Sequence, residues 1–320
     1  MSKFYLGSSW PLGSTITKRG VNFSVAAPEA SYVELLLFSR DSDLDPIETI
    51  KLDKSYQSGD YWHIEVEGLT AGCLYCYRVI PKQKINTVSD YEKFLLIDPC
   101  ARAITGWEIF QNSTLKSKRF APYLKGVVCE RDLFDFESHP RPRLSLEKTV
   151  IYELHVGGFT RKSGSSMQSF KKGTFLGLIE KIPYLKDLGI TTIELLPIFA
   201  FDPYDAPKGL TNFWGYSPLN WFTPHQDYIV SNDPLNARAE FKEFVAFCHD
   251  QGIEVLLDVV YNHTAEGNQD GPVISWKGFG ENIYYHKDKK KKDFLDVSGC
   301  GNTISANQPI VRHLILESMR

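Results

Sequence analysis

Three polar residues stand at or near the end of a strongly apolar run in this chain. The run spans Ile253 to His263 (IEVLLDVVYNH), holds Asp258 inside it, and ends at Asn262 and His263. A segment this apolar on both faces predicts a strand in the middle of a covered, parallel sheet. In β/α proteins the loops after the carboxyl ends of such strands form the face that binds ligands. We therefore expect these side chains to bind a polar ligand, the alternative being that Asp258 only caps or pairs locally.

A second group of candidate residues is aromatic. Residues 212 to 218 read NFWGYSP, in which aromatic rings surround a glycine that allows a tight backbone turn. They lie in a long interval, about 198 to 236, and a second long interval follows at about 264 to 308. Long loops in a compact fold are usually functional. Exposed aromatic faces suit sugar rings, whereas Trp214 and Tyr216 could equally serve only to pack the loop.

Apolar strands alternate with amphipathic helices in the second half of the chain. The strands are expected at Val150 to Val156, at Ile190 to Pro197 and in the run that ends at His263. Apolar residues at helical spacing fill the two intervals, and Gly189 and Gly252 suit the left-handed position that ends a helix. The order β-α-β-α-β predicts parallel strands.

The first hundred residues alternate apolar and polar residues in short runs. This period of two is typical of strands with one buried face, and turn residues separate the runs. The pattern predicts a small antiparallel β-sandwich. Its expected strands are Val21 to Ala27, Tyr32 to Phe38, Trp62 to Glu67 and Leu74 to Ile80.

The periodicity fades between the two halves. From about residue 111 to 148 neither pattern holds, and His139 to Arg143 (HPRPR) has the composition of an extended connector. We therefore expect a sandwich domain at 1–115, a connector at 116–147 and an α/β domain at 148–320.

Composition excludes several classes of protein. A chain of 320 residues with 42% hydrophobic residues has room for two buried cores. Its net charge of −3 provides no long-range field for nucleic acid or an anionic membrane. No apolar run has the length of a signal peptide or a membrane span. The six cysteines are expected to be buried thiols in a reducing compartment, so we expect a cytoplasmic protein, or a stromal one in a plant or alga.

Several motifs in order resemble the alpha-amylase superfamily of glycoside hydrolases. They are IELLP (193–197), WGYSP (214–218) and DVVYNH (258–263). Four further stretches resemble the isoamylase and glycogen-debranching branch, which cleaves α-1,6 branch points: TAEG (264–267), GFG (278–280), NIYY (282–285) and SGCGN (298–302). GVNFSVAAPEA (20–30), GLTAGCLYCYRV (68–79) and LLIDPCARAI (95–104) resemble the carbohydrate-binding sandwich of that branch. The resemblance implies an immunoglobulin-like β-sandwich followed by the first part of a (β/α)8 TIM barrel, with about three strands and incomplete in this chain.

The resemblance also assigns roles to three residues. Asp258 and His263 match positions that line the subsite for the sugar being cleaved; His263 would bind a sugar hydroxyl, and Asp258 would orient a neighbouring arginine or the ring. Tyr216 matches the aromatic residue on which that sugar stacks. A neutral, polyhydroxylated ring is recognised by hydrogen bonds at its edge and an apolar surface against its face. Asn262 resembles a calcium ligand of some relatives, but isoamylase-type members need not share that site, so neither a metal nor a cofactor is expected.

The implied reaction is retaining hydrolysis of α-1,6 branch linkages in glycogen, amylopectin or limit dextrin. Retaining enzymes use two carboxyl groups about 5 to 5.5 Å apart, one as nucleophile and one as acid and base. In this superfamily they belong to later barrel strands, and no GFRFDL-like motif for the nucleophile occurs in the 320 residues. Four other carboxylates match no catalytic motif: Glu153, Glu194, Asp227 and Glu266. We therefore expect a chain truncated before its catalytic groups, which lie beyond Arg320.

Two other functions remain open at this stage. One is a non-catalytic glucan-binding or regulatory isoamylase-like protein. The other is a branching enzyme or a trehalose-forming hydrolase, against which the SGCGN stretch argues.

The pure 320-residue chain should have negligible hydrolytic activity. Incubation with glycogen, followed by chromatography of the released linear chains, tests this expectation. Release above a buffer control would show that carboxylates within the chain perform the reaction.

Overall fold

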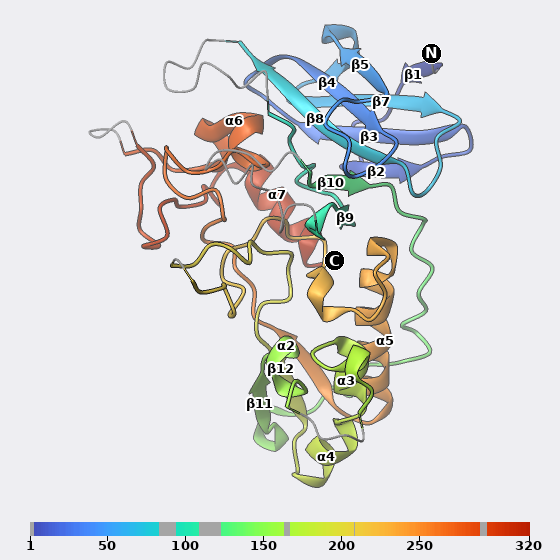
Figure 1. The fold of residues 1–320 in the computed structure, drawn as a ribbon, viewed down its shortest axis with the longest axis vertical. Helices are drawn as coiled ribbons and strands as arrows, with labels where there is room; N and C mark the ends of the chain where they lie inside the picture. The colour runs from blue at the N-terminus through green and yellow to red at the C-terminus, as the bar shows by residue number, and fades with distance from the viewer. Residues whose placement is uncertain (1–2, 83–93, 109–122, 163–166, 208, 289–292) are drawn as a thin grey trace. The chain divides into compact units, whose positions relative to one another are not determined.

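The computed structural model describes residues 3–82, 94–108, 123–162, 167–207, 209–288 and 293–320 (Figure 1). The chain divides into two compact units. The first comprises Met1–Arg131, Leu219–Phe222 and Tyr261–Arg320, and the second comprises Asp132–Pro218 and Thr223–Val260. The predicted domain boundaries at 115 and 147 stay predictions.

Two antiparallel sheets form the sandwich of the first unit (Figure 1). One has the order β1-β7-β3-β2, with β6 paired to β7, and the other has the order β5-β4-β8-β10-β9. The four predicted strands are confirmed as β3, β4, β7 and β8. The bounds are β1 Phe4–Leu6, β2 Gly13–Ile16, β3 Gly20–Ala26, β4 Ala30–Phe38, β5 Glu48–Leu52, β6 Gln57–Ser58, β7 Tyr61–Glu67, β8 Leu74–Pro81, β9 Ile104–Thr105 and β10 Lys125–Val127.

The alternating residues of the sandwich strands build its core. Val21, Phe23 and Ile64 are fully buried between the sheets, as the period of two predicted. The rings of Phe23 and Tyr75 meet edge to face with centroids 5.0 Å apart, which joins the two sheets.

The expectation of six buried thiols is wrong for half of the cysteines. Cys76, Cys100 and Cys248 are buried, and none of the six cysteines forms a disulfide with another. Cys73 and Cys129 are half-buried and Cys300 is exposed.

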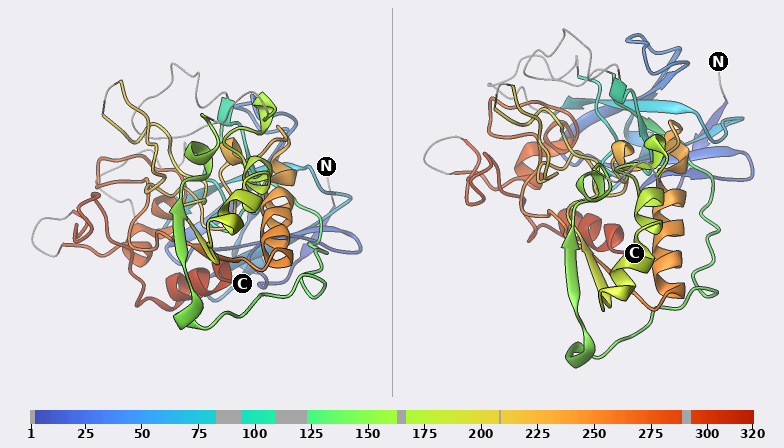
Figure 2. Two further views of the ribbon diagram at one scale, coloured as in Figure 1. Left: turned by 90° about the horizontal axis from the view of Figure 1, so that it is seen from below. Right: turned by 60° about the horizontal axis from the view of Figure 1, so that its bottom comes forward.

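A three-stranded parallel sheet forms the centre of the second unit, with the order β11-β12-β13. The helices α3, α4 and α5 lie on one side of this sheet (Figures 1 and 2), as the β-α-β-α-β pattern predicted. A continuous apolar core joins the two layers and includes Phe175, Ile193 and Phe244. The bounds are β11 Ile151–Leu154, β12 Thr192–Leu195, β13 Glu254–Leu257, α2 Val156–Phe159, α3 Phe175–Ile179, α4 Ile182–Asp187 and α5 Ala237–Asp250.

Two details of the second unit differ from prediction. The third strand ends at Leu257 instead of continuing to His263, and among the described strands it lies at the edge of its sheet, with β12 in the middle. Its Leu256 is 44% exposed. The predicted long helix before Gly189 is two short helices, because Pro183 lacks the N–H that would continue a helix and instead occupies the first turn of α4.

The segment after the third strand contains a helix that the sequence did not predict. This helix is α6 (Trp276–Tyr284), and a second helix, α7 (Pro309–Ser318), follows it. The sequence of α6 contains Gly278 and Gly280, and two glycines so close together favour a loop. At Gly278 a Cβ would lie 2.4 Å from a methyl carbon of Leu96, so the close approach of α6 to the sandwich explains this glycine. The short 3₁₀ turns are η1 Lys54–Tyr56, η3 Leu146–Lys148, η4 Ser169–Lys171, η5 Gln226–Tyr228 and η6 Pro234–Asn236.

A buried carboxylate lies beside the sandwich core. Asp98 is fully buried and accepts hydrogen bonds from the Tyr75 hydroxyl at 2.9 Å and from the Cys100 amide at 2.8 Å. Burial raises the pKa of Asp98 to about 6, because removing the charge from water costs more than these two donors recover.

Replacing Asp98 by Asn should remove a pH dependence from the stability of the protein. The folded state keeps a proton on Asp98 up to about pH 6, whereas an unfolded chain releases it near pH ~4. The group therefore costs free energy of folding progressively as pH rises through this window, by about 3 kcal/mol at most. Urea unfolding at pH 4.5, 6 and 7.5 should show a smaller loss of stability with rising pH in Asp98→Asn, while the exposed control Asp60→Asn should follow the wild type. Parallel profiles for wild type and Asp98→Asn would contradict the assignment.

Candidate functional site

The structure brings two of the predicted residues together at the carboxyl edge of the parallel sheet. The Asp258 amide donates to the carbonyl of Leu195 at 2.9 Å, which continues the strand pairing one residue beyond β13. The hydroxyl of Tyr216 donates to Oδ2 of Asp258. These side chains come from separate loops, and the bond fixes the direction of the Tyr216 ring, which is 41% exposed. Asp258 therefore orients an aromatic ring, and the roles expected for both residues stay predictions.

Neighbouring carboxylates keep the Tyr216 hydroxyl protonated. Partial burial and the bond to Asp258 raise the pKa of Tyr216 to about 12. Glu153 and Glu194 add to this rise, and they are direct neighbours in the register of β11 and β12. At neutral pH the hydroxyl therefore remains a donor, and the Asp258 carboxylate keeps lone pairs for a further donor such as a sugar hydroxyl.

A bond from a backbone amide to a side chain holds the loop that carries Tyr216. The Gly215 amide donates to Oδ1 of Asn212 at 3.1 Å, and Gly215 has a φ of 83°. A Cβ there would lie 3.1 Å from both the Phe201 ring and the Pro197 carbonyl, so only glycine fits without displacement. The tight turn predicted for NFWGYSP is confirmed.

The aromatic rings of this loop point outward. Trp214 is 57% exposed and Phe213 is 45% exposed. Trp214 also meets the rings of His155 and Phe213 edge to face, so the alternative that Trp214 and Tyr216 pack the loop stays a prediction beside ligand binding. Exposed rings beside a hydrogen-bonding carboxylate suit a ligand with an apolar face and a polar edge.

A histidine that sequence reasoning missed supports the aromatic loop. His155 follows β11, and its ring stacks on Phe213 with centroids 4.0 Å apart and an angle of 8°. Its Nδ1 accepts from the Gly158 amide at 2.9 Å, and the Tyr228 hydroxyl lies 3.3 Å from its Nε2. Burial lowers the pKa of His155, so the ring is neutral at physiological pH. The signal in the sequence was a histidine at the carboxyl end of VIYELHV.

A second histidine of this unit is fully buried. The rings of His225 and Phe201 pack with their centroids 3.8 Å apart. Burial lowers the pKa of His225 to about 4. A neutral imidazole in this position packs against Phe201 and supplies no charge.

His263, the third predicted residue, belongs to the first unit. It is 6% exposed, and its Nδ1 lies 2.9 Å from Oδ1 of Asn262. The following residue, Thr264, is held by Asn302, which accepts from the Thr264 amide and donates to the Thr264 carbonyl, both at 3.0 Å. The backbone that carries His263 is thus fixed, and its role stays a prediction.

Glu266 is a buried carboxylate that organises the segment after His263. It is 1% exposed and accepts from the amides of Ile274, Ser275 and Lys277 at 2.7 to 2.8 Å, and from the Tyr285 hydroxyl at 2.5 Å. Four donors occupy its oxygens, so its role is to fix this segment rather than to perform catalysis.

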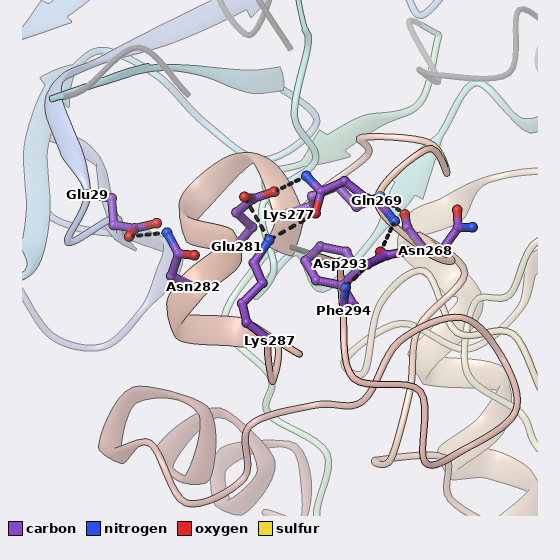
Figure 3. Close-up of polar contacts among 9 residues, drawn as sticks. All are labelled: Glu29, Asn268, Gln269, Lys277, Glu281, Asn282, Lys287, Asp293 and Phe294. Carbon is purple, nitrogen blue, oxygen red and sulfur yellow. Dashed lines mark hydrogen bonds and ion pairs between the residues drawn. The ribbon is translucent and has the colours of Figure 1, made fainter. Parts of the chain in front are cut away.

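A network of cations and carboxylates completes that segment, as Figure 3 shows. Buried Lys277 donates to the carbonyl of Asn268 at 2.7 Å, and burial lowers its pKa to about 8. Lys287 pairs with Glu281 at 2.8 Å and donates to Gln269 at 2.9 Å. Because these groups satisfy one another, the network stabilises the segment. In the described residues, no group of three or more histidines, cysteines or carboxylates is arranged to hold a metal ion.

Comparison with known proteins identifies the family. Residues 141–309, more than half of the chain, match the family model of the alpha amylase catalytic domain. The chain belongs to the alpha-amylase family. Residues 11–101 match carbohydrate-binding module 48, the isoamylase N-terminal domain. The expected fold, a sandwich followed by part of an alpha-amylase barrel, is confirmed.

The curated relatives of this alpha-amylase family member are debranching enzymes by name. Isoamylase 3 of Oryza sativa subsp. japonica is 36% identical over 99% of the chain, which covers 43% of that protein. The glycogen debranching enzyme of Erwinia tasmaniensis is 38% identical over 98% of the chain and 48% of that protein. The chain thus spans less than half the length of these relatives.

Solved structures agree on the fold. A pullulanase from Paenibacillus barengoltzii, solved with maltohexaose and alpha-cyclodextrin, is 25% identical with a TM-score of 0.74 over 98% of this chain and 47% of that one. The pullulanase from Bacillus acidopullulyticus is 27% identical with a TM-score of 0.71, over 98% and 36% of the two chains. In the described part of this chain, every helix is too short or too polar to cross a bilayer.

Replacing Asp258 by Asn should lower the pKa of Tyr216 from about 12 toward its ordinary value of ~10. Part of the rise should remain, because burial also contributes. Titration of tyrosine labelled with carbon-13 at Cζ reports the Tyr216 pKa directly, and the exposed control Asp187→Asn should leave it unchanged. An unaltered Tyr216 titration in Asp258→Asn would show that the two side chains do not interact in solution.

Proposed function

We propose that this chain supplies part of the sugar-binding site of an α-1,6-glucan debranching enzyme that acts on glycogen or related branched glucans. The observation that carries the proposal is the exposed Tyr216 ring, held by the Asp258 carboxylate at the carboxyl edge of the sheet. The relatives named isoamylase and glycogen debranching enzyme support the linkage, and the pullulanase solved with maltohexaose supports a glucan ligand.

The chemistry of the two residues suits a glucosyl ring. The face of Tyr216 offers an apolar surface on which the C–H groups of a sugar pack. Asp258 already accepts the Tyr216 hydroxyl and has lone pairs left for a sugar hydroxyl at the ring edge.

Holding the ring in this way positions the glycosidic bond for attack. In a retaining reaction a carboxylate attacks the anomeric carbon while a carboxylic acid protonates the leaving oxygen, and water then releases the sugar. Fixing the sugar before these steps lowers the entropic cost of the reaction. The residues of this chain contribute the positioning, and no GFRFDL-like motif for the nucleophile occurs among its 320 residues.

A non-catalytic glucan-binding or regulatory role is the second candidate. The observation that favours it is the ordered loop with its exposed Tyr216 ring, which offers a binding surface without a catalytic group of its own. Both candidates require glucan binding at Tyr216, and they differ only in whether linear chains are released.

Replacing Tyr216 by Ala should weaken binding of a branched maltooligosaccharide by about tenfold, because the stacking surface is lost. Isothermal titration calorimetry of the 320-residue chain measures this affinity. The fold should persist, since Tyr216 is 41% exposed. In a longer form that carries the catalytic carboxylates, the same substitution should sharply lower turnover.

The matched control is Tyr184→Ala, which removes another exposed tyrosine, on α4. It should bind like the wild type, and circular dichroism should confirm that both variants are folded. Equal affinities of wild type and Tyr216→Ala would refute the placement of the sugar at Tyr216.

A further inference from the structure

The two ring nitrogens of His155 face groups of opposite hydrogen-bonding character. Nδ1 lies 2.9 Å from the amide of Gly158, which can only donate, and this bond caps the start of α2. Nε2 faces the carbonyl of Phe213, which can only accept. A neutral imidazole carries one proton, and these two partners require it on Nε2. His155 thus joins the end of β11 to the aromatic loop, residues 212–216, in a single tautomer.

A second proton on His155 does not fit this arrangement. It would sit on Nδ1 and point at the Gly158 amide, so two donors would face each other and the cap of α2 would be lost. The backbone of α2 lies directly against the rings, since a Cβ at Gly157 would be 3.0 Å from Cε1 of His155 and one at Gly158 would be 3.0 Å from Cζ of Phe213. The close packing holds the imidazole in the orientation that makes both bonds.

The surroundings of His155 favour the neutral ring. Burial lowers the pKa of His155, the bond to the Phe213 carbonyl opposes this change, and the positive charge of Arg161 lowers the pKa further. Two further titratable groups beside the ring, Tyr228 and His225, are neutral at physiological pH, because burial raises the pKa of the tyrosine and lowers that of the histidine to about 4. His155 therefore gains its second proton only as the pH falls below ~6.5.

Three rings pack together at the start of the aromatic loop. Phe213 stacks on His155 with centroids 4.0 Å apart, and the Trp214 ring stands edge to face on both, at 5.3 Å from Phe213 and 6.4 Å from His155. Stacked and edge-to-face pairs are the arrangements that aromatic rings prefer. His155 therefore fixes the directions of two exposed loop rings together with the carbonyl of Phe213.

The fixed carbonyl and Tyr216 belong to the same turn. Within it the Gly215 amide donates to Oδ1 of Asn212 at 3.1 Å, and Gly215 has a φ of 83°. His155 holds the backbone at the start of the turn, and Asp258 holds the Tyr216 hydroxyl at its end. The hydroxyl bond fixes only the tip of the Tyr216 ring, so the plane of the ring depends on the backbone that His155 holds.

We infer that His155 is a positioning residue for the sugar site at Tyr216: its neutral ring, protonated on Nε2 alone, fixes the turn that presents Tyr216, and protonation of Nδ1 releases that turn and weakens sugar binding. The presence of a sugar at Tyr216 rests on the proposed function, whereas the positioning rests on the contacts of His155 itself. The site is then fully formed at neutral pH and is lost as the pH falls through the titration of this histidine.

Nitrogen-15 nuclear magnetic resonance of histidine-labelled protein tests the positioning without a ligand. At pH 7.5 the signals of His155, identified by their loss in His155→Asn, should show a protonated Nε2 and an unprotonated Nδ1. As the pH falls through the midpoint of the His155 titration, the Gly215 amide should lose protection from hydrogen exchange, measured against its intrinsic exchange rate at each pH. A proton on Nδ1 at pH 7.5, or equal protection of Gly215 on both sides of the midpoint, overturns the inference.

Isothermal titration calorimetry with a branched maltooligosaccharide connects His155 to sugar binding. Over the pH range in which circular dichroism shows a native fold, the wild-type affinity should fall about fivefold below the His155 midpoint, because the loop must then be ordered on binding. His155→Asn can still cap α2 but is too short to hold Phe213, so it should bind about fivefold more weakly at pH 7.5 and show no midpoint. His155→Gln places an N–H near the position of Nε2 and should recover part of that affinity, also without a midpoint.

The matched control is His139→Asn, which removes a half-buried histidine of the same unit outside the site. It should keep the wild-type affinity and midpoint. The inference is overturned if His155→Asn binds as tightly as the wild type at pH 7.5 or keeps its pH dependence. If neither the wild type nor any variant binds the sugar, the proposed function fails, and the exchange of the Gly215 amide alone decides whether His155 positions the loop.

Discussion

The parallel pairing of β12 and β13 is the constraint on which the candidate site depends. Each strand residue faces one side of the sheet, so a fixed register decides which side chains meet at its carboxyl edge. Here the register places Glu194 opposite Leu256, and the pairing continues until the Asp258 amide meets the Leu195 carbonyl. A slip of one residue would direct the Asp258 carboxylate to the helix-covered face, where an unpaired charge is costly.

The aromatic loop depends on that carboxylate and on the end of the first strand. Asp258 holds the hydroxyl of Tyr216, and His155 stacks on Phe213. The two anchors come from the ends of β13 and β11, so the sheet orients a loop that has little regular structure of its own. A platform oriented before binding requires less ordering when a sugar arrives, which is the physical basis for placing a glucosyl ring there.

In the first unit, buried polar groups that hydrogen-bond one another fix the conformation of the segment after His263. Glu266 gathers three amides and a hydroxyl, and Lys277 donates to backbone carbonyls of the same segment. A polar network of this kind specifies one conformation, because any rearrangement would leave a buried donor or acceptor without a partner. The segment that follows His263 is thereby ordered without a metal ligand set in the described residues.

The sequence by itself determined the class of the fold and several of its elements. The period of two predicted β3 and β7, the apolar strands separated by amphipathic helices predicted a parallel sheet, and the motifs around Tyr216 and Asp258 indicated an alpha-amylase relative. These features are local, because they follow from side-chain periodicity and short motifs.

Only the tertiary structure decided which residues meet. The bond from Tyr216 to Asp258 spans 42 residues and that between Asn22 and Ser8 spans 14, so neither has a local signal. The helix α6 was missed because Gly278 serves a close contact with Leu96 rather than a turn. Burial likewise decided the chemistry, since it raises the pKa of Asp98 and lowers that of His225, and burial depends on contacts between residues far apart in the chain.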